Sequence, residues 1–263
     1  MNKNLTIAIP LSRDKRVFQC LDSIDMKCEV IVVLNGSYDK SIERRLNERD
    51  IKILKMRKFS FSKFYNLIIK KSKFDKIFFM DSDCIFVKGA LSKLNKKMKN
   101  FLIIKGKINF LYNSLQTYIT AKAREFTTSD PPNLYIPGLI FNKKLFHKIG
   151  FFNENINYCA DAEMAKRIFK SGIKWKNEHI SLINHDPVLF KEDLRSAFRY
   201  GIGIAERSSF DEINFMRRLL KDPWIYLANG IKIKGILVGL YLFLWSIVLN
   251  LGMTKMLVLK KIN

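Results

Sequence analysis

Asp81 and Asp83 follow the apolar run IFFM and are separated by a single serine, Ser82. In an extended chain, side chains two residues apart lie on the same side. Two carboxylates placed in this way can hold a hard divalent cation, directly or through water, and that cation can bridge a diphosphate. The alternative is a polar turn that only closes a strand, because Asp and Ser are common turn residues.

Short apolar runs in the N-terminal part of the chain are expected to bring several such turns together. The runs and the turns that end them are 5–9 with Pro10, 30–34 with Asn35-Gly36-Ser37, and 77–80 with Asp81-Ser82-Asp83. Segments with helical spacing lie between these runs, around residues 17–24 and 64–68. Strands that alternate with helices predict a parallel sheet covered on both faces, in which ligands bind beyond the carboxyl ends of the strands.

Later segments are expected to continue this α/β pattern. Residues 93–107 form a basic, partly helical connection, and turns are expected at Pro131-Pro132 and at Ile136-Pro137-Gly138. Residues 161–171 are expected to form a helix that begins with an aspartate and ends at Gly172.

Composition indicates a globular protein with a strong attraction for phosphate. The 263 residues are 48% hydrophobic, enough for one α/β domain and a short appendage, and the net charge is +23. Nucleic acid, anionic lipid and phosphorylated substrates are all compatible with that charge. The four cysteines form no Cys-x-x-Cys pair and indicate buried thiols in a reducing compartment. The N-terminus has no secretory signal pattern, so a cytoplasmic location is expected.

The C-terminal region differs from the rest in composition. Residues 191–234 are amphipathic and rich in arginine, and residues 235–254 contain no charged residue. The uncharged segment has about the length needed to cross a bilayer. Lysines precede and follow it, so the orientation rule gives no direction. A spanning helix, a helix or shallow hairpin in the membrane interface, and a buried soluble helix all remain open. The expected domains are residues 1–190 and a membrane-associating region of residues 191–263.

Four motifs in order over residues 5–187 resemble the inverting glycosyltransferases of family 2. They are IAIPLSRDKRVFQCLDSI, EVIVVLNGSYDKS, FSFSKFYNLIIKKSKFDKIFFMDSDCIF, and GLIFNKKLFHKIGFFNENI followed by ADAEMAKRIFKSG. The resemblance implies the GT-A fold of nucleotide-diphospho-sugar transferases, with a mostly parallel sheet flanked by helices. It also implies metal-dependent transfer of a sugar from a nucleotide-diphosphate donor to a hydroxyl group.

The resemblance also assigns roles to residues on the donor side. Those expected to bind the donor nucleotide are Pro10, Ser12, Asn35, Asp39, Asn66, Asp81 and Ser82. Asp81 and Asp83 are expected to hold the donor diphosphate through Mn²⁺ or Mg²⁺. His185 matches a position that reaches the metal in some relatives, although a single histidine is more often structural. Tyr65 and Ile68 depart from the family pattern, which has arginine and glycine there.

On the acceptor side, Asp161 matches the family's catalytic base. A hydroxyl that attacks a sugar must pass its proton to a positioned carboxylate. Glu163 is an alternative base, because Ala160 replaces the glutamate that usually precedes the aspartate. Asp161 also suits a helix N-cap, and the two roles are compatible.

Arg195, Arg199 and Tyr200 in the sequence RSAFRYG resemble, in degenerate form, the Gln-x-x-Arg-Trp element of membrane-bound family members. Arginine clamps phosphate with a planar fork, which suggests contact with the acceptor or its phosphate. The alternative is an amphipathic helix that approaches anionic lipid.

The sequence therefore predicts an inverting glycosyltransferase, peripheral or single-pass, at the cytoplasmic face of the cell membrane. A nucleotide-diphospho-sugar is the expected donor, and a lipid-linked glycan or polysaccharide precursor is the expected acceptor. Two other classes stay open: a basic nucleic-acid-binding protein and an inactive, membrane-tethered scaffold with a transferase-like fold. Because no zinc finger, RNA-recognition signature or basic helix with heptads is found, no nucleic-acid partner is expected.

Overall fold

The computed structural model describes residues 4–58, 60–129, 134–207 and 212–262. The chain divides into two compact units. The sheet unit comprises residues 1–109, 134–154 and 161–185, and the helical unit comprises residues 110–133, 155–160 and 186–263. The helical unit contains residues 186–263, which include the expected membrane-associating region of residues 191–263, together with two earlier segments. One of them carries a helix that packs on the C-terminal helices.

An eight-stranded mixed sheet forms the centre of the sheet unit, in the order β3-β2-β1-β4-β7-β6-β8-β5. The strands are β1 Leu5–Leu11, β2 Glu29–Asn35, β3 Lys52–Met56, β4 Lys76–Phe79, β5 Cys84–Phe86, β6 Ile103–Phe110, β7 Leu139–Asn142 and β8 Lys176–His185. Pairing is parallel from β3 through β4 and antiparallel in the pairs β4–β7, β6–β7 and β5–β8. The expected α/β fold is confirmed, with a parallel half and an antiparallel half.

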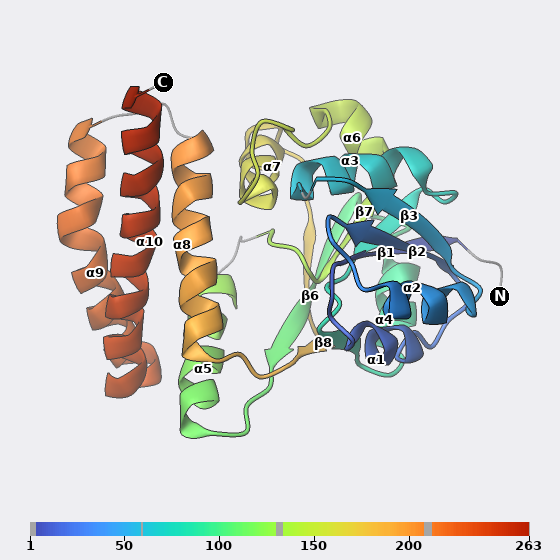
Figure 1. Ribbon diagram of the computed structural model, residues 1–263, viewed down its shortest axis with the longest axis horizontal. Coiled ribbons are helices and arrows are strands. Elements are labelled where there is room, and N and C mark those ends of the chain that lie inside the picture. Colours follow the sequence, from blue (N-terminus) through green and yellow to red (C-terminus); the bar gives the residue numbers. More distant parts are fainter. Residues whose placement is uncertain (1–3, 59, 130–133, 208–211, 263) are drawn as a thin grey trace. The chain divides into compact units, whose positions relative to one another are not determined.

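Helices cover both faces of this sheet (Figure 1). They are α1 Val17–Asp22, α2 Lys40–Asn47, α3 Phe61–Lys71, α4 Ala90–Lys97, α6 Lys144–Ile149 and α7 Ala160–Lys170. Side chains alternate between the faces along each strand. Phe78 therefore packs in the core that includes α1, α2 and α4, whereas Phe79 on the other face packs edge-on against Phe64 of α3 and at a tilt against Phe141 of β7.

Two details of the expected pattern are corrected by the structure. Pro10 lies inside β1 and does not stop it. The backbone groups of Ala8 and Pro10 face β4, and the carbonyl of Ala8 accepts a hydrogen bond from the N–H of Met80. Because β4 has ended by then, Pro10 has no strand beside it on that side and needs no N–H donor. The connection at 93–107 is helical only to Lys97, because the second part enters the sheet as β6. The turn at Ile136-Pro137 contains a cis peptide bond, and Pro131-Pro132 lies outside the described residues.

The helical unit contains α5 Leu115–Ser129, α8 Phe190–Arg207, α9 Glu212–Lys234 and α10 Ile236–Ile262. Glycines allow α8 and α10 to pack closely: a Cβ atom on Gly201 would collide with the carbonyl of Leu249, and one on Gly252 with the carbonyl of Phe198. Among the described residues, Ile236–Leu259 is long and apolar enough to cross a membrane. Half of its most apolar stretch is buried in the protein, so this observation alone is weak support for a span.

Candidate functional site

The loops that follow β1, β2 and β4 meet at one edge of the sheet. The hydroxyl of Ser12 donates to the carbonyl of Ser37 at 3.3 Å, and Arg13 Nη2 lies 3.0 Å from Ser37 Oγ. Burial alone would raise the pKa of Asp14, but hydrogen bonds from Arg16 and Ser82 outweigh it and lower the pKa. These contacts join turns from three parallel strands, as expected for a ligand site at their carboxyl ends.

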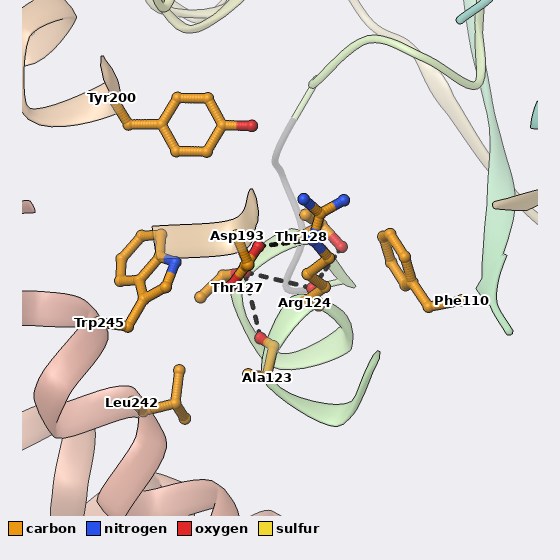
Figure 2. Close-up of a pocket in the computed structure, with 9 residues that line it drawn as sticks. All are labelled: Phe110, Ala123, Arg124, Thr127, Thr128, Asp193, Tyr200, Leu242 and Trp245. Atoms are coloured by element: carbon orange, nitrogen blue, oxygen red, sulfur yellow. Dashed lines mark hydrogen bonds and ion pairs between the residues drawn. The ribbon is translucent and has the colours of Figure 1, made fainter. Parts of the chain in front are cut away.

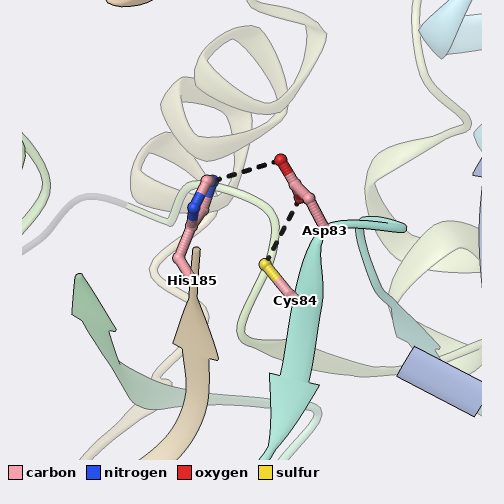
Figure 3. Close-up of side chains that lie close together, drawn as sticks. All are labelled: Asp83, Cys84 and His185. Atoms are coloured by element: carbon pink, nitrogen blue, oxygen red, sulfur yellow. Dashed lines mark hydrogen bonds and ion pairs between the residues drawn. The ribbon is translucent and has the colours of Figure 1, made fainter. Parts of the chain in front are cut away.

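A candidate metal site lies where β5 pairs with β8 (Figure 3). The register sets Cys84 opposite His185, so that Asp83 comes close to a residue a hundred positions away. Asp83 Oδ2 lies 3.7 Å from His185 Nε2, and the candidate ligand atoms of Asp83, Cys84 and His185 all lie within 4.8 Å of one another. Asp81 is not a member of this group.

The side chains present fit a manganese ion. The carboxylate of Asp83 suits Mn²⁺ or Mg²⁺, whereas the imidazole nitrogen of His185 is a ligand for transition metals rather than for Mg²⁺. Cys84 is buried, its thiol donates to Asp83 Oδ1 at 3.7 Å, and burial raises its pKa. We therefore regard Asp83 and His185 as the candidate ligands of this group, and a ligand role for Asp81 stays a prediction.

Asp161 is the second residue of α7, which begins one residue earlier than expected, at Ala160, so it lies inside the first turn and not at the N-cap. Its carboxylate is held by two backbone groups. The N–H of Ile136 donates to Asp161 Oδ2 at 3.1 Å, and the N–H of Ala162 donates to Oδ1 at 2.9 Å. Burial raises the pKa of Asp161, although both hydrogen bonds and the charge of Lys105 oppose the shift. A carboxylate that is oriented in this way and more basic than usual is suited to accept a proton.

The charge of Lys105 on β6 interacts with that of Asp161 and with that of Asp81 in the turn after β4. Desolvation lowers the pKa of Lys105 to about 8, and the charges of Asp161 and Asp81 both oppose that shift. One ammonium group is thus within electrostatic reach of two carboxylates that are 80 residues apart in sequence. Asp81 and Asp161 both belong to the sheet unit, and their convergence at one donor site stays a prediction.

Asn35, at the end of β2, is a buried polar residue that fits a nucleobase. Its side chain is 3% exposed, and neither Nδ2 nor Oδ1 has a hydrogen-bond partner among the described residues. Leaving a buried amide unsatisfied costs about 1–3 kcal/mol per group, which a ligand with a donor and an acceptor would recover. Nearby, Asp39 caps α2 by accepting from the N–H of Ser41 at 2.8 Å, which lowers its pKa and supports the loop.

Two of the expected site residues, Asn66 and Glu163, form hydrogen bonds or ion pairs with other residues of the protein. Asn66 on α3 exchanges two hydrogen bonds of 2.9 Å with the backbone of Phe152 and donates to Glu154 Oε1 at 2.9 Å. Its amide thus holds the segment that precedes α7. Glu163, the alternative base, forms a two-pronged ion pair with Arg167, with both N–O distances 2.8 Å.

Tyr200 lines a cavity inside the helical unit (Figure 2). Arg124 of α5 and Asp193 of α8 also line it and form an ion pair at 2.7 Å, and Tyr241 donates to the other oxygen of Asp193 at 2.7 Å. Arg195 and Arg199 are exposed on α8 and are not among the lining residues. The arginine that shares a cavity with Tyr200 is therefore Arg124.

Three cationic residues near these sites escaped prediction. Arg16 lies 3.7 Å from Asp83, Lys105 acts on Asp81 and Asp161, and Arg124 pairs with Asp193. The cationic motif SRDKR just after β1 could have pointed to Arg16 as a residue near the donor site. No strand was predicted around Lys105 and no helix around Arg124. The neighbours of these two residues could therefore not be predicted from the sequence.

Comparison with known proteins identifies the family and the fold. The model of glycosyl transferase family 2 matches residues 13–158, more than half of the chain. The S. aureus protein TarS in complex with UDP-GlcNAc aligns at 15% identity and a TM-score of 0.56, over 88% of this chain and 76% of that chain. A mannosyltransferase from Pyrobaculum calidifontis in complex with GDP-Man and Mn²⁺ aligns at 14% identity and a TM-score of 0.67, over 97% and 88%. A search of curated proteins finds no match.

Proposed function

The chain belongs to glycosyltransferase family 2, and from this premise we propose that it transfers a sugar, with inversion, from a nucleoside-diphosphate donor to a hydroxyl group. The donor lies at the loops that follow β1, β2 and β4. Asn35 contacts the base, with Pro10, Ser12 and Asp39 bordering it. The observation that carries the proposal is the register of β5 with β8, which brings Asp83 Oδ2 to 3.7 Å from His185 Nε2 beside the turn after β4.

The chemistry assigned to the residues is a single displacement. The acceptor oxygen attacks the anomeric carbon, the bond from that carbon to the diphosphate oxygen breaks, and the diphosphate leaves with the electron pair. Asp161 takes the proton of the attacking hydroxyl. Asp161 rather than Glu163 suits this role, because Glu163 is neutralised by Arg167.

Asp83 and His185 would hold the metal, with Asp81 beside them. Mn²⁺ held there would supply positive charge to offset that of the departing diphosphate. The structural neighbours carry UDP-GlcNAc in one case and GDP-Man with Mn²⁺ in the other, which supports a donor of this class without choosing between the two bases.

A calorimetric binding screen tests the proposed donor site. Purified protein is titrated with UDP-sugars and GDP-sugars, with and without Mn²⁺. We expect at least one donor to bind only when the metal is present. Failure of every donor to bind would support the inactive scaffold instead, and salt-sensitive binding of RNA or DNA in place of donor binding would support a nucleic-acid protein.

The helical unit supports an acceptor in the membrane. Large apolar side chains are exposed along α10: Ile236, Leu237, Leu240, Leu244, Ile247, Leu251, Val258 and Leu259. An exposed apolar stripe of this size indicates an interaction surface. Lys232 and Lys234 precede the stripe and Lys255 lies within its last part, so anionic lipid would complement it. We infer contact with the cytoplasmic leaflet and a lipid-linked glycan as acceptor, whose phosphate Tyr200, Arg195 or Arg199 would contact.

Sedimentation with vesicles tests the membrane contact. The protein should bind vesicles of phosphatidylglycerol and phosphatidylcholine, and the double variant Leu240→Glu with Leu244→Glu should bind about tenfold more weakly, since it places two charges in apolar surroundings. Phe169→Glu, an exposed apolar position in the sheet unit, is the matched control and should bind as the wild type does. Equal binding by the double variant and the control would rule out the stripe as the lipid contact.

A further inference from the structure

Lys105 is fixed by the turn that precedes β7. Its Nζ donates to the carbonyl oxygen of Tyr135 at 2.5 Å and to that of Pro137 at 3.0 Å. The two carbonyls belong to the residues on either side of Ile136. An ammonium group bound to both of them therefore sets the direction in which the backbone N–H of Ile136 points.

That N–H group donates to the proposed base. It lies 3.1 Å from Asp161 Oδ2, while the N–H of Ala162 holds the other oxygen. The carboxylate is thus oriented by its own helix at one oxygen and by the 135–137 turn at the other. Loss of the Lys105 contacts would free the turn and release one of these two constraints.

The charge of Lys105 acts on the same carboxylate. Burial favours the neutral form of Asp161, and Lys105 on β6 favours the ionised form. The other charged groups on α7 near Asp161 are Glu163 and Arg167, which neutralise one another. No sequence motif assigned a role to Lys105, although lysine is rarely enclosed in this way without a partner.

We propose that Lys105 is a positioning residue for sugar transfer: it holds the Tyr135–Pro137 turn so that the N–H of Ile136 orients Asp161. The proposal rests on the proposed function only in taking Asp161 as the base. Lys105 itself touches neither the sugar nor the hydroxyl in this scheme.

The test compares Lys105→Met and Lys105→Arg with Lys107→Met, an exposed lysine two positions along β6. We expect Lys105→Met to lower kcat by about tenfold to a hundredfold, as a small misplacement of a catalytic group does. The acid limb of its pH profile should move to higher pH, because the neutral form of Asp161 is no longer opposed. Lys105→Arg keeps the charge and should restore the limb, and Lys107→Met should match the wild type.

Hydrogen exchange gives a readout that does not require activity. The amide of Ile136 should exchange faster in Lys105→Met than in the wild type or in Lys107→Met. Unchanged exchange together with an unchanged pH profile would overturn the proposal, as would equal losses in the Met and Arg variants. If Asp161→Asn retained transfer, the proposed base would be wrong; if it abolished transfer while Lys105→Met behaved as the wild type, only the role of Lys105 would fail.

Discussion

Replacing Asp161 by Asn should lower the rate of sugar transfer by about 10²- to 10⁴-fold, the range that general-base catalysis contributes. The amide has nearly the same shape, and its oxygen can still accept from one of the two N–H groups that hold Asp161, those of Ile136 and Ala162, so α7 should remain in place. It cannot take a proton at neutral pH. Donor binding, measured by calorimetry with Mn²⁺, should therefore stay close to that of the wild type while kcat falls.

Glu163→Gln is the matched control, since it removes a carboxylate two positions away on the same helix. That variant should keep most of its transfer activity and lose only the ion pair with Arg167. If Asp161→Asn transferred sugar as the wild type does and Glu163→Gln lost transfer, Glu163 rather than Asp161 would be the base.

The pH dependence of the wild type provides an independent check on the same base. Burial raises the pKa of Asp161, and the base acts only when it is ionised. Activity should therefore fall as the pH drops through a value above the ordinary range of an aspartate, and the falling limb should be absent from the residual rate of Asp161→Asn.

The parallel half of the fold was predictable because its signals are local. Apolar runs at 5–9, 30–34 and 77–80 appear as β1, β2 and β4, each within one or two residues of the expected bounds. Turn residues at their ends mark where a ligand would bind, and the Ser12–Ser37 contact joins two of them. Gly172, with φ of 67°, ends α7 as expected.

The antiparallel half was not predictable in the same way, because its strands depend on distant partners. The basic segment around Lys105 has no alternating pattern, yet it pairs with β7 as part of β6. Likewise, the approach of His185 to Asp83 follows from the register of β5 and β8, which no local pattern specifies. Asn66 was expected to bind the donor, and its structural contacts were not predictable for a similar reason: its partners, Phe152 and Glu154, stand more than 80 residues away in sequence.

The grouping of α5 with the C-terminal helices shows the same limit. Residues 110–133 carry no composition shift that would separate them from the sheet unit, and their placement depends on contacts with α8 and α10. One such contact is the ion pair of Arg124 and Asp193. Arg124 precedes the domain boundary predicted at residue 190, and Asp193 follows it.

Asp83→Ala should abolish metal-dependent donor binding and sugar transfer together, each by at least about a hundredfold. Asp83 is the one carboxylate in the group with Cys84 and His185, and its Oδ2 lies 3.7 Å from His185 Nε2. Removing it leaves that group of three with an imidazole and a buried thiol and no carboxylate, which does not suit Mn²⁺ even with Asp81 nearby in sequence. Asp22→Ala is the control, because that carboxylate is exposed and its ion pair within the described part of the chain is with Arg49 on the surface. Donor titrations with and without Mn²⁺ give the result directly. If Asp83→Ala bound donor with the same dependence on Mn²⁺ as the wild type, the metal would be held elsewhere, and the turn after β4 would be a structural turn.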